Sequence, residues 1–296
     1  MRILSFVLLS LIVQAPQGKA TFSSRSDLVV LHVSVVDRHA GFVGGLPREA
    51  FMVREDGRPQ PIAFFEHEDT PVTVGLVIDN SQSMAPRREA VIAAGMAFAA
   101  SSHPDDEMFT LNFNEKVWPG LSDGHPFTSN HEELREALSR SGARGKTALF
   151  DAIDAALQQL DRGQCPRKVL LIVSDGGDNA SRASFARILD GALRRDIVIY
   201  TIGLVDPNDR DARPDLLRKL ADVTGGESFF PKSNPDILPT RERIARDIRS
   251  SYTLGYVPPV GATAIQRRVR VDVEAADRRK LAVRARSLYI GQGDSK

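Results

Sequence analysis

The chain has 296 residues, which is enough for one large domain or two domains. Charged residues make up 26% of it and apolar residues 42%, which is usual for a soluble globular protein. The formal net charge is +1 and no long basic run occurs, so composition gives no support for binding to nucleic acid.

The first twenty residues differ in character from the remainder. Arg2 precedes an apolar stretch over residues 3–13, which is too short to span a bilayer because that takes about 20 apolar residues. Gly18 and Ala20 suit the −3 and −1 positions of a cleavage site. We therefore expect a signal peptide over residues 1–20 and an exported, periplasmic or extracellular protein, with a buried strand or an uncleaved anchor as the alternatives. No later stretch has the pattern of a transmembrane segment.

The only cysteine, Cys165, lies in the turn Gly163–Pro166. An intrachain disulfide is therefore excluded, and the fold has to rest on its core. A partly buried, inert thiol is favoured over a reactive one.

Residues 21–70 have the pattern of a small β unit. Leu28–Val36 and Phe51–Glu55 read as strands, and Asp56-Gly57 is typical of a hairpin turn. We expect the return strand of this hairpin at Gln60–Phe65. So few strands cannot bury a core alone.

Residues 71–235 alternate between strand and helix patterns, and a terminal helix follows over residues 236–250. The predicted strands are Val72–Ile78, Met108–Phe113 with a short partner at Lys116–Trp118, Val169–Val173, Ile197–Leu204 and Phe229–Phe230. The predicted helices begin at Pro86, cover Glu132–Leu138 and Leu149–Leu160, extend from about Ser181 to Arg195, and cover Pro214–Val223 and Ile237–Ser250. Continuous apolar strands alternating with helices predict an α/β fold with a mostly parallel sheet covered on both faces.

The β pattern returns over residues 251–290, before a short tail at 291–296. Tyr252–Val257, Arg268–Val273 and Leu281–Arg286 read as strands. We expect them to complete the N-terminal β unit, so that the α/β domain is inserted in, or flanked by, a small β-sandwich.

Oxygen-bearing side chains follow the first strand of the α/β domain. Asp79, Ser81 and Ser83 offer three oxygen ligands in one loop, and oxygen ligands suit Mg²⁺, Mn²⁺ or Ca²⁺. Such a cation takes about six ligands. Thr147, before a helix, and Asp175, after a strand, are further candidates, because the carboxyl ends of parallel strands lie on one edge of the sheet.

This order of residues resembles a known family. D-x-S-x-S after a first strand, a Thr before a central helix and Asp-Gly after a later strand resemble the metal-ion-dependent adhesion site of von Willebrand factor type A domains. Asp79, Ser81, Ser83, Thr147 and Asp175 fill all five positions. The resemblance implies a Rossmann-like doubly wound sheet and a divalent cation, Mg²⁺ first, with Mn²⁺ or Ca²⁺ as alternatives.

The chain as a whole also resembles a family of exported bacterial proteins with a domain related to type A. The resemblance runs from Val33-Ser34-Val35 through Tyr252–Tyr256 to Val283–Arg286. In type A domains the serines bind the cation directly and the aspartates bind it directly or through water. One coordination position stays open, which implies a partner protein that supplies a Glu or Asp carboxylate. The alternative is a structural or assembly module of the cell envelope, in which the cation only stabilises the loops.

Other readings of the same residues fit less well. Gly142–Thr147 resembles a phosphate-binding loop, but that motif needs a glycine where Arg140 stands, so we expect no nucleotide. None of the six histidines has metal-ligand spacing, and none stands at motif spacing from Ser81 or Ser83. The sequence therefore indicates a binding protein rather than an enzyme.

Overall fold

The computed structural model describes most of the chain outside its ends. The described ranges are 28–37, 41–67, 69–99, 103–122, 124–140, 142–206, 208–233, 236–259, 266–274 and 281–291. The signal peptide expected over residues 1–20 and residues 292–296 of the expected tail lie outside these ranges. Within them, no helix combines the length and the apolar character needed to cross a bilayer.

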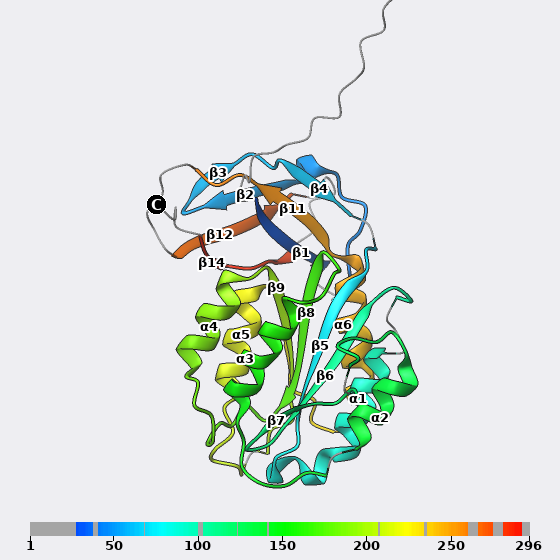
Figure 1. The fold of residues 1–296 in the computed structure, drawn as a ribbon. Helices are drawn as coiled ribbons and strands as arrows, with labels where there is room; N and C mark the ends of the chain where they lie inside the picture. Colours follow the sequence, from blue (N-terminus) through cyan, green and yellow to red (C-terminus); the bar gives the residue numbers. More distant parts are fainter. Residues whose placement is uncertain are drawn as a thin grey trace, which may run out of the picture.

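A six-stranded sheet forms the centre of the α/β domain (Figure 1). Its order is β10-β9-β8-β5-β6-β7, and all neighbours are parallel except β6 and β7. The strands are β5 (Val72–Asp79), β6 (Glu107–Phe113), β7 (Val117–Pro119), β8 (Arg167–Ser174), β9 (Ile197–Gly203) and β10 (Ser228–Phe229). Every residue of β5 is buried, as expected for a central strand covered on both faces.

Helices cover both faces of this sheet. Figure 1 shows α3, α4 and α5 on one side and α1, α2 and α6 on the other. They are α1 (Arg88–Ala99) after a 3₁₀ turn at Gln82–Arg87, α2 (His131–Ser139), α3 (Leu149–Leu160), α4 (Phe185–Arg194), α5 (Pro214–Thr224) and α6 (Ile237–Ser250). The predicted doubly wound, mostly parallel α/β fold is confirmed.

The predicted start of α4 near Ser181 is wrong. The helix begins at Phe185, and Ser184 caps it by accepting a hydrogen bond from the backbone N–H of Arg187. The preceding residues are held in a loop instead, because Asp151 accepts the backbone N–H groups of Arg182 and Ala183.

Two four-stranded antiparallel sheets pack above the central sheet in Figure 1. One has the order β13-β1-β11-β4 and the other β14-β12-β2-β3. The strands are β1 (Val29–Asp37), β2 (Phe51–Glu55), β3 (Arg58–Gln60), β4 (Phe64–Glu66), β11 (Tyr252–Tyr256), β12 (Gln266–Val273), β13 (Leu281–Arg284) and β14 (Leu288–Ile290). Leu31, Val53, Tyr252 and Val271 belong to one buried cluster shared by both sheets. Each sheet takes strands from both sides of the α/β domain in sequence.

The predicted return strand at Gln60–Phe65 is also wrong. Asp56 and Gly57 have φ values of 46° and 80°, so they form a two-residue turn that pairs Glu55 directly with Arg58. The return strand β3 therefore starts earlier and ends before Pro61. Phe64–Glu66 pairs with β11 in the opposite sheet.

The candidate residues lie at the end of the α/β domain that is distant from the sandwich. β5 starts beside the sandwich and ends at Asp79 on the far side, while α6 leads the chain back to β11 (Figure 1). The loops at the carboxyl ends of the strands are therefore clear of the sandwich.

Candidate metal centre

Asp79 is the last residue of β5 and is fully buried. Its Oδ1 accepts the backbone N–H of Ser81 at 2.9 Å, and its Oδ2 accepts the hydroxyl of Ser174 at 2.6 Å. Ser174 ends the neighbouring strand β8. The carboxylate is therefore fixed between two adjacent strand ends.

Ser81, Ser83 and Asp175 continue this cluster of oxygen atoms. The hydroxyl oxygens of Ser81 and Ser83 lie 3.1 Å apart, and Ser83 donates to Asp175 Oδ2 at 2.6 Å. Asp175 Oδ1 accepts the backbone N–H of Gly177. The structure thus brings four of the five sequence-predicted side chains into one connected group.

Thr147 lies in a third loop, which hydrogen bonds tie to both others. Its backbone N–H donates to Asn179 Oδ1, and its carbonyl accepts the backbone N–H groups of Asn179 and Ala180. On the other side, Gly145 O accepts the N–H of Gln82. Within the described ranges the hydroxyl of Thr147 makes no hydrogen bond, so its oxygen is available as a ligand for a cation.

Gly176 makes the turn after Asp175 possible. Its φ is +86°, a region that favours glycine, and a Cβ atom at this position would lie 2.5 Å from the carbonyl oxygen of Arg213. A side chain at this position would therefore collide with the backbone at Arg213, so the turn that follows Asp175 requires glycine.

The electrostatics of this cluster favour a cation. The pKa of Asp79 is raised to about 7, mainly by burial and to a smaller extent by the nearby charge of Asp175, although the hydrogen bonds from Ser174 and Ser81 act to lower it. Among the described Lys, Arg and His residues, none forms an ion pair with Asp79 or Asp175. Two close carboxylates without a cationic partner, together with hydroxyl oxygens, fit a hard divalent cation.

A carboxylate-rich or histidine-rich centre is not present in the described ranges, where no group of three or more His, Cys, Asp or Glu residues could hold a metal. Any cation at this place would therefore depend on the hydroxyl groups of Ser81, Ser83 and Thr147. Because these hydroxyl groups are neutral, a bound divalent ion would still attract a further anion.

Sequence reasoning missed the residues that position the centre. Ser174 is one, and its signal is a polar residue at the end of an apolar strand. The others form a network below the Asp79 loop: Arg88 donates to Asn80 Oδ1 at 2.5 Å, and Asn80 donates to Asn112 Oδ1 at 3.0 Å. No spacing in the sequence links these three residues.

Asp178 is a spare carboxylate near the centre with a structural role. It accepts the hydroxyl of Ser181 at 2.6 Å and the backbone N–H of Phe150 at 3.3 Å, so it caps the first turn of α3. Burial raises its pKa. Its hydrogen bonds orient the loop that contains Asn179.

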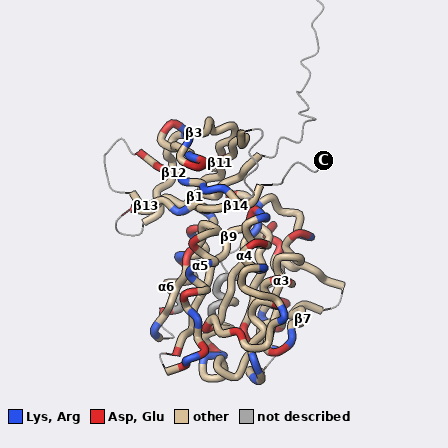
Figure 2. Tube along the Cα trace, turned by 90° about the vertical axis from the view of Figure 1, so that its left-hand side faces the viewer, with Lys and Arg blue, Asp and Glu red and all other residues tan. Residues whose placement is uncertain are grey.

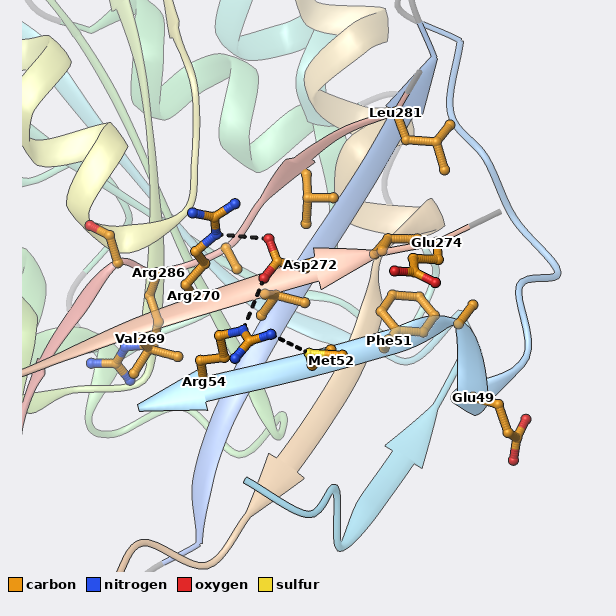
Figure 3. A pocket seen from close by; sticks show the side chains of 16 residues that line it. Glu49, Phe51, Met52, Arg54, Val269, Arg270, Asp272, Glu274, Leu281 and Arg286 are labelled. Carbon is orange, nitrogen blue, oxygen red and sulfur yellow. Dashed lines mark hydrogen bonds and ion pairs between the residues drawn. The ribbon is translucent and has the colours of Figure 1, made fainter. Parts of the chain in front are cut away.

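A pocket of about 700 Å³ lies in the sandwich beside β2, β12 and β13, away from the candidate metal centre (Figure 3). Three of its charged side chains bind one another: Asp272 accepts from Arg270 Nε at 2.7 Å and lies 3.5 Å from Arg54 Nε. None of the five predicted site residues lines it.

Comparison with known proteins gives the class of the α/β domain. Residues 74–177 match the sequence model of the von Willebrand factor type A domain. No curated protein shows significant similarity to the chain. The matched segment includes Asp79, Ser81, Ser83, Thr147 and Asp175.

Solved structures agree with this fold. A von Willebrand factor type A structure from Catenulispora acidiphila has a TM-score of 0.52 and 15% identity, over 90% of this chain and 74% of that chain. Proximal thread matrix protein 1 from the mussel byssus has a TM-score of 0.51 and 16% identity, over 64% and 48%. A mutant of the PilB minor pilin from Streptococcus sanguinis has a TM-score of 0.51 and 13% identity, over 65% and 64%. At these identities the likeness shows the fold alone, which is that of a type A domain.

Proposed function

We propose that this protein binds a partner protein through a divalent cation, with Mg²⁺ as the preferred ion. The cation is held by Asp79, Ser81, Ser83, Thr147 and Asp175. The observation that carries the proposal is the connected oxygen cluster in which Ser83 joins the Asp79 loop to Asp175, with no basic side chain of the described ranges paired to either carboxylate. The match to a type A domain over residues 74–177 supports it.

The five side chains would have different roles. Asp79 and Asp175 supply negative charge, while Ser81, Ser83 and Thr147 supply neutral oxygens. A bound cation would contribute positive charge and an open coordination position. A Glu or Asp carboxylate of the partner would then complete the ligand set through a charge-assisted contact.

The proposal includes export and excludes catalysis. The signal-peptide pattern over residues 1–20 supports a periplasmic or extracellular location. A binding role is favoured over hydrolysis because, among the described residues, no histidine contacts Ser81 or Ser83, whose hydroxyls bond to each other and to Asp175.

Cation binding is tested by titration calorimetry of residues 21–296 with Mg²⁺, Mn²⁺ and Ca²⁺. We expect uptake by the unsubstituted protein, and an affinity lower by about tenfold or more in Ser83→Ala, as for other groups that support a metal centre. Ser139→Ala, at the end of α2, is the matched control because the Ser139 hydroxyl, among the described residues, bonds only to Arg135 O in its own helix. Absence of heat with all three ions would refute the proposal.

Partner binding is tested by capture from the native envelope fraction with Mg²⁺ or with EDTA. We expect chelation and Ser83→Ala to release the same partner. If chelation instead lowers thermal stability while capture persists, the cation only stabilises the loops and the alternative of a structural module is correct.

A further inference from the structure

A cleft of about 540 Å³ lies beside the candidate metal centre. It is lined by the turn at 114–116 after β6, by Arg140 after α2 and by the loop at 142–144, with Trp118 of β7 as an apolar wall. Both loops are part of the framework of the centre. Arg144 donates its backbone N–H to Asn80 O at 2.8 Å, and Asn114 O accepts the backbone N–H of Ala148, next to Thr147, at 2.7 Å.

The side chains around this cleft carry excess positive charge. Lys116, Arg144 and Lys146 are exposed, and none forms an ion pair within the described ranges. Arg140 is neutralised by Glu136 at 3.1 Å. The carboxylate of Glu115 accepts the backbone N–H of Lys146 and keeps its negative charge, which offsets one of the three, so the basic side chains remain in excess by two charges.

The loop on the opposite side of the centre is slightly acidic. The loop at 208–213 and Asp206 before it carry three acidic residues, Asp206, Asp209 and Asp211, against two basic ones, Arg210 and Arg213, and Asp206 lies 3.9 Å from Arg87. The loop is joined to the centre because Arg213 donates its backbone N–H to Asp175 O at 3.2 Å. Charged residues of both signs lie at this end of the domain (Figure 2). A negatively charged partner is therefore attracted more strongly on the side of the cleft than on the side of this loop.

We propose that the cleft binds a second acidic side chain of the same partner segment whose first carboxylate completes the cation's ligands. This inference rests on the proposed function and adds to it the chemistry and direction of the partner: a segment with two acidic residues, which extends from the centre toward Arg144 and Lys116 and away from Asp209. Trp118 would contact the apolar part of that segment.

The probes are synthetic fluorescein-labelled Gly/Ser peptides with no acidic residue, with one Glu, or with two Glu residues separated by one to four positions. Fluorescence anisotropy with Mg²⁺ measures their affinities. We expect one spacing of two Glu residues to bind several-fold more tightly than a single Glu, since an exposed ion pair contributes about threefold to fivefold. This gain should shrink as salt is raised, because screening weakens exposed pairs.

Variants locate the second acidic group. Arg144→Ala and Lys116→Ala should each remove about threefold of the affinity for the two-Glu peptide and leave the one-Glu peptide and Mg²⁺ uptake unchanged. Arg268→Ala is the matched control, because Arg268 is an exposed arginine on β12 of the sandwich. Circular dichroism melts establish that each variant is folded.

The outcomes separate the two proposals. If one-Glu and two-Glu peptides bind equally with Mg²⁺ and both are lost in EDTA, the cleft inference is wrong and the metal-dependent function stands. The cleft inference is also overturned if Arg144→Ala weakens both peptides equally or neither. If the two-Glu peptide binds equally in EDTA, and Arg144→Ala weakens it, the metal-dependent function is wrong and the cleft alone binds the acid.

Discussion

At the scale of single residues, the carboxylate of Asp79 is the most constrained group in the candidate centre. It is fully buried and accepts hydrogen bonds from Ser81 N and Ser174 Oγ. The charge of Asp175 lies nearby. Burial therefore raises its pKa from 3.8 to about 7 in the cation-free protein.

This pKa predicts how stability depends on pH in EDTA. The unfolded carboxyl group loses its proton near pH 4, whereas the folded one keeps it until about pH 7, so the folded state binds more protons between these values. The free energy of unfolding should therefore decrease from pH 4 to pH 7, by an amount on the order of 4 kcal/mol. Urea denaturation at a series of pH values measures this decrease.

Asp79→Asn is the comparison, because an amide has no such titration. Its stability in EDTA should vary less across the same range, so that the two curves converge at low pH and separate toward pH 7. Saturating Mg²⁺ should remove the decrease in the unsubstituted protein. Parallel curves for the two proteins would show that Asp79 is ionised throughout.

At the scale of elements, α5 ends against the sandwich. Gly225, with φ +86°, terminates the helix, and a Cβ atom there would lie 2.5 Å from the backbone nitrogen of Arg286. The backbone N–H of Ser287 also donates to Val223 O at 3.2 Å. The end of this helix therefore fixes where the segment between β13 and β14 passes.

Gly225→Ala should lower the free energy of unfolding by at least about 1 kcal/mol more than Gly57→Ala. Both glycines have positive φ, so the conformational cost is similar, but Gly57 has no atom within 4 Å of the added Cβ. Paired urea denaturation curves measure the difference. Equal losses would mean that the contact between α5 and the sandwich relaxes at no cost.

At the scale of the whole molecule, a buried ion network joins the sandwich to the α/β domain. Arg284 of β13 forms ion pairs with Glu227, before β10, and with Asp247 of α6, and Asp247 also accepts the hydroxyl of Tyr200 at 2.9 Å. The side chain of Asp247 is only 1% exposed. Removal of Arg284 would therefore leave a buried charge without its cationic partner.

Arg284→Ala should lower the free energy of unfolding by about 3 kcal/mol. The fluorescence of Trp118, the only tryptophan, reports on the α/β domain, and near-UV dichroism of the tyrosines reports mainly on the sandwich. Both signals should change at lower urea concentration, because the network belongs to both units. A shift in only one signal would contradict this coupling.

Arg270→Ala provides the control for this prediction. Arg270 pairs with Asp272 on the surface of β12 and is 77% exposed. Solvent screening makes such a pair weak, so its loss should cost less than about 1 kcal/mol. A comparable loss in both variants would mean that burial does not distinguish the two pairs.

Local patterns were enough to indicate the candidate centre but not its supports. Asp79 and Asp175 each follow an apolar strand, and parallel strands end on one edge, so their proximity followed from pattern alone. Ser174, Arg88 and Asn112 act through contacts between segments distant in sequence. Such contacts have no spacing signature, because the sheet order brings them together.

The sequence by itself determined the α/β class and the position of the oxygen-bearing loops, since burial on both faces requires continuous apolar strands whatever their neighbours are. Only the tertiary structure decided the division of the sandwich. Phe64–Glu66 pairs with β11 rather than with β2 because the tight turn at Asp56-Gly57 already supplies β2 with its partner. Strand pairing depends on which edges remain available after folding, and that information is not present in any single segment.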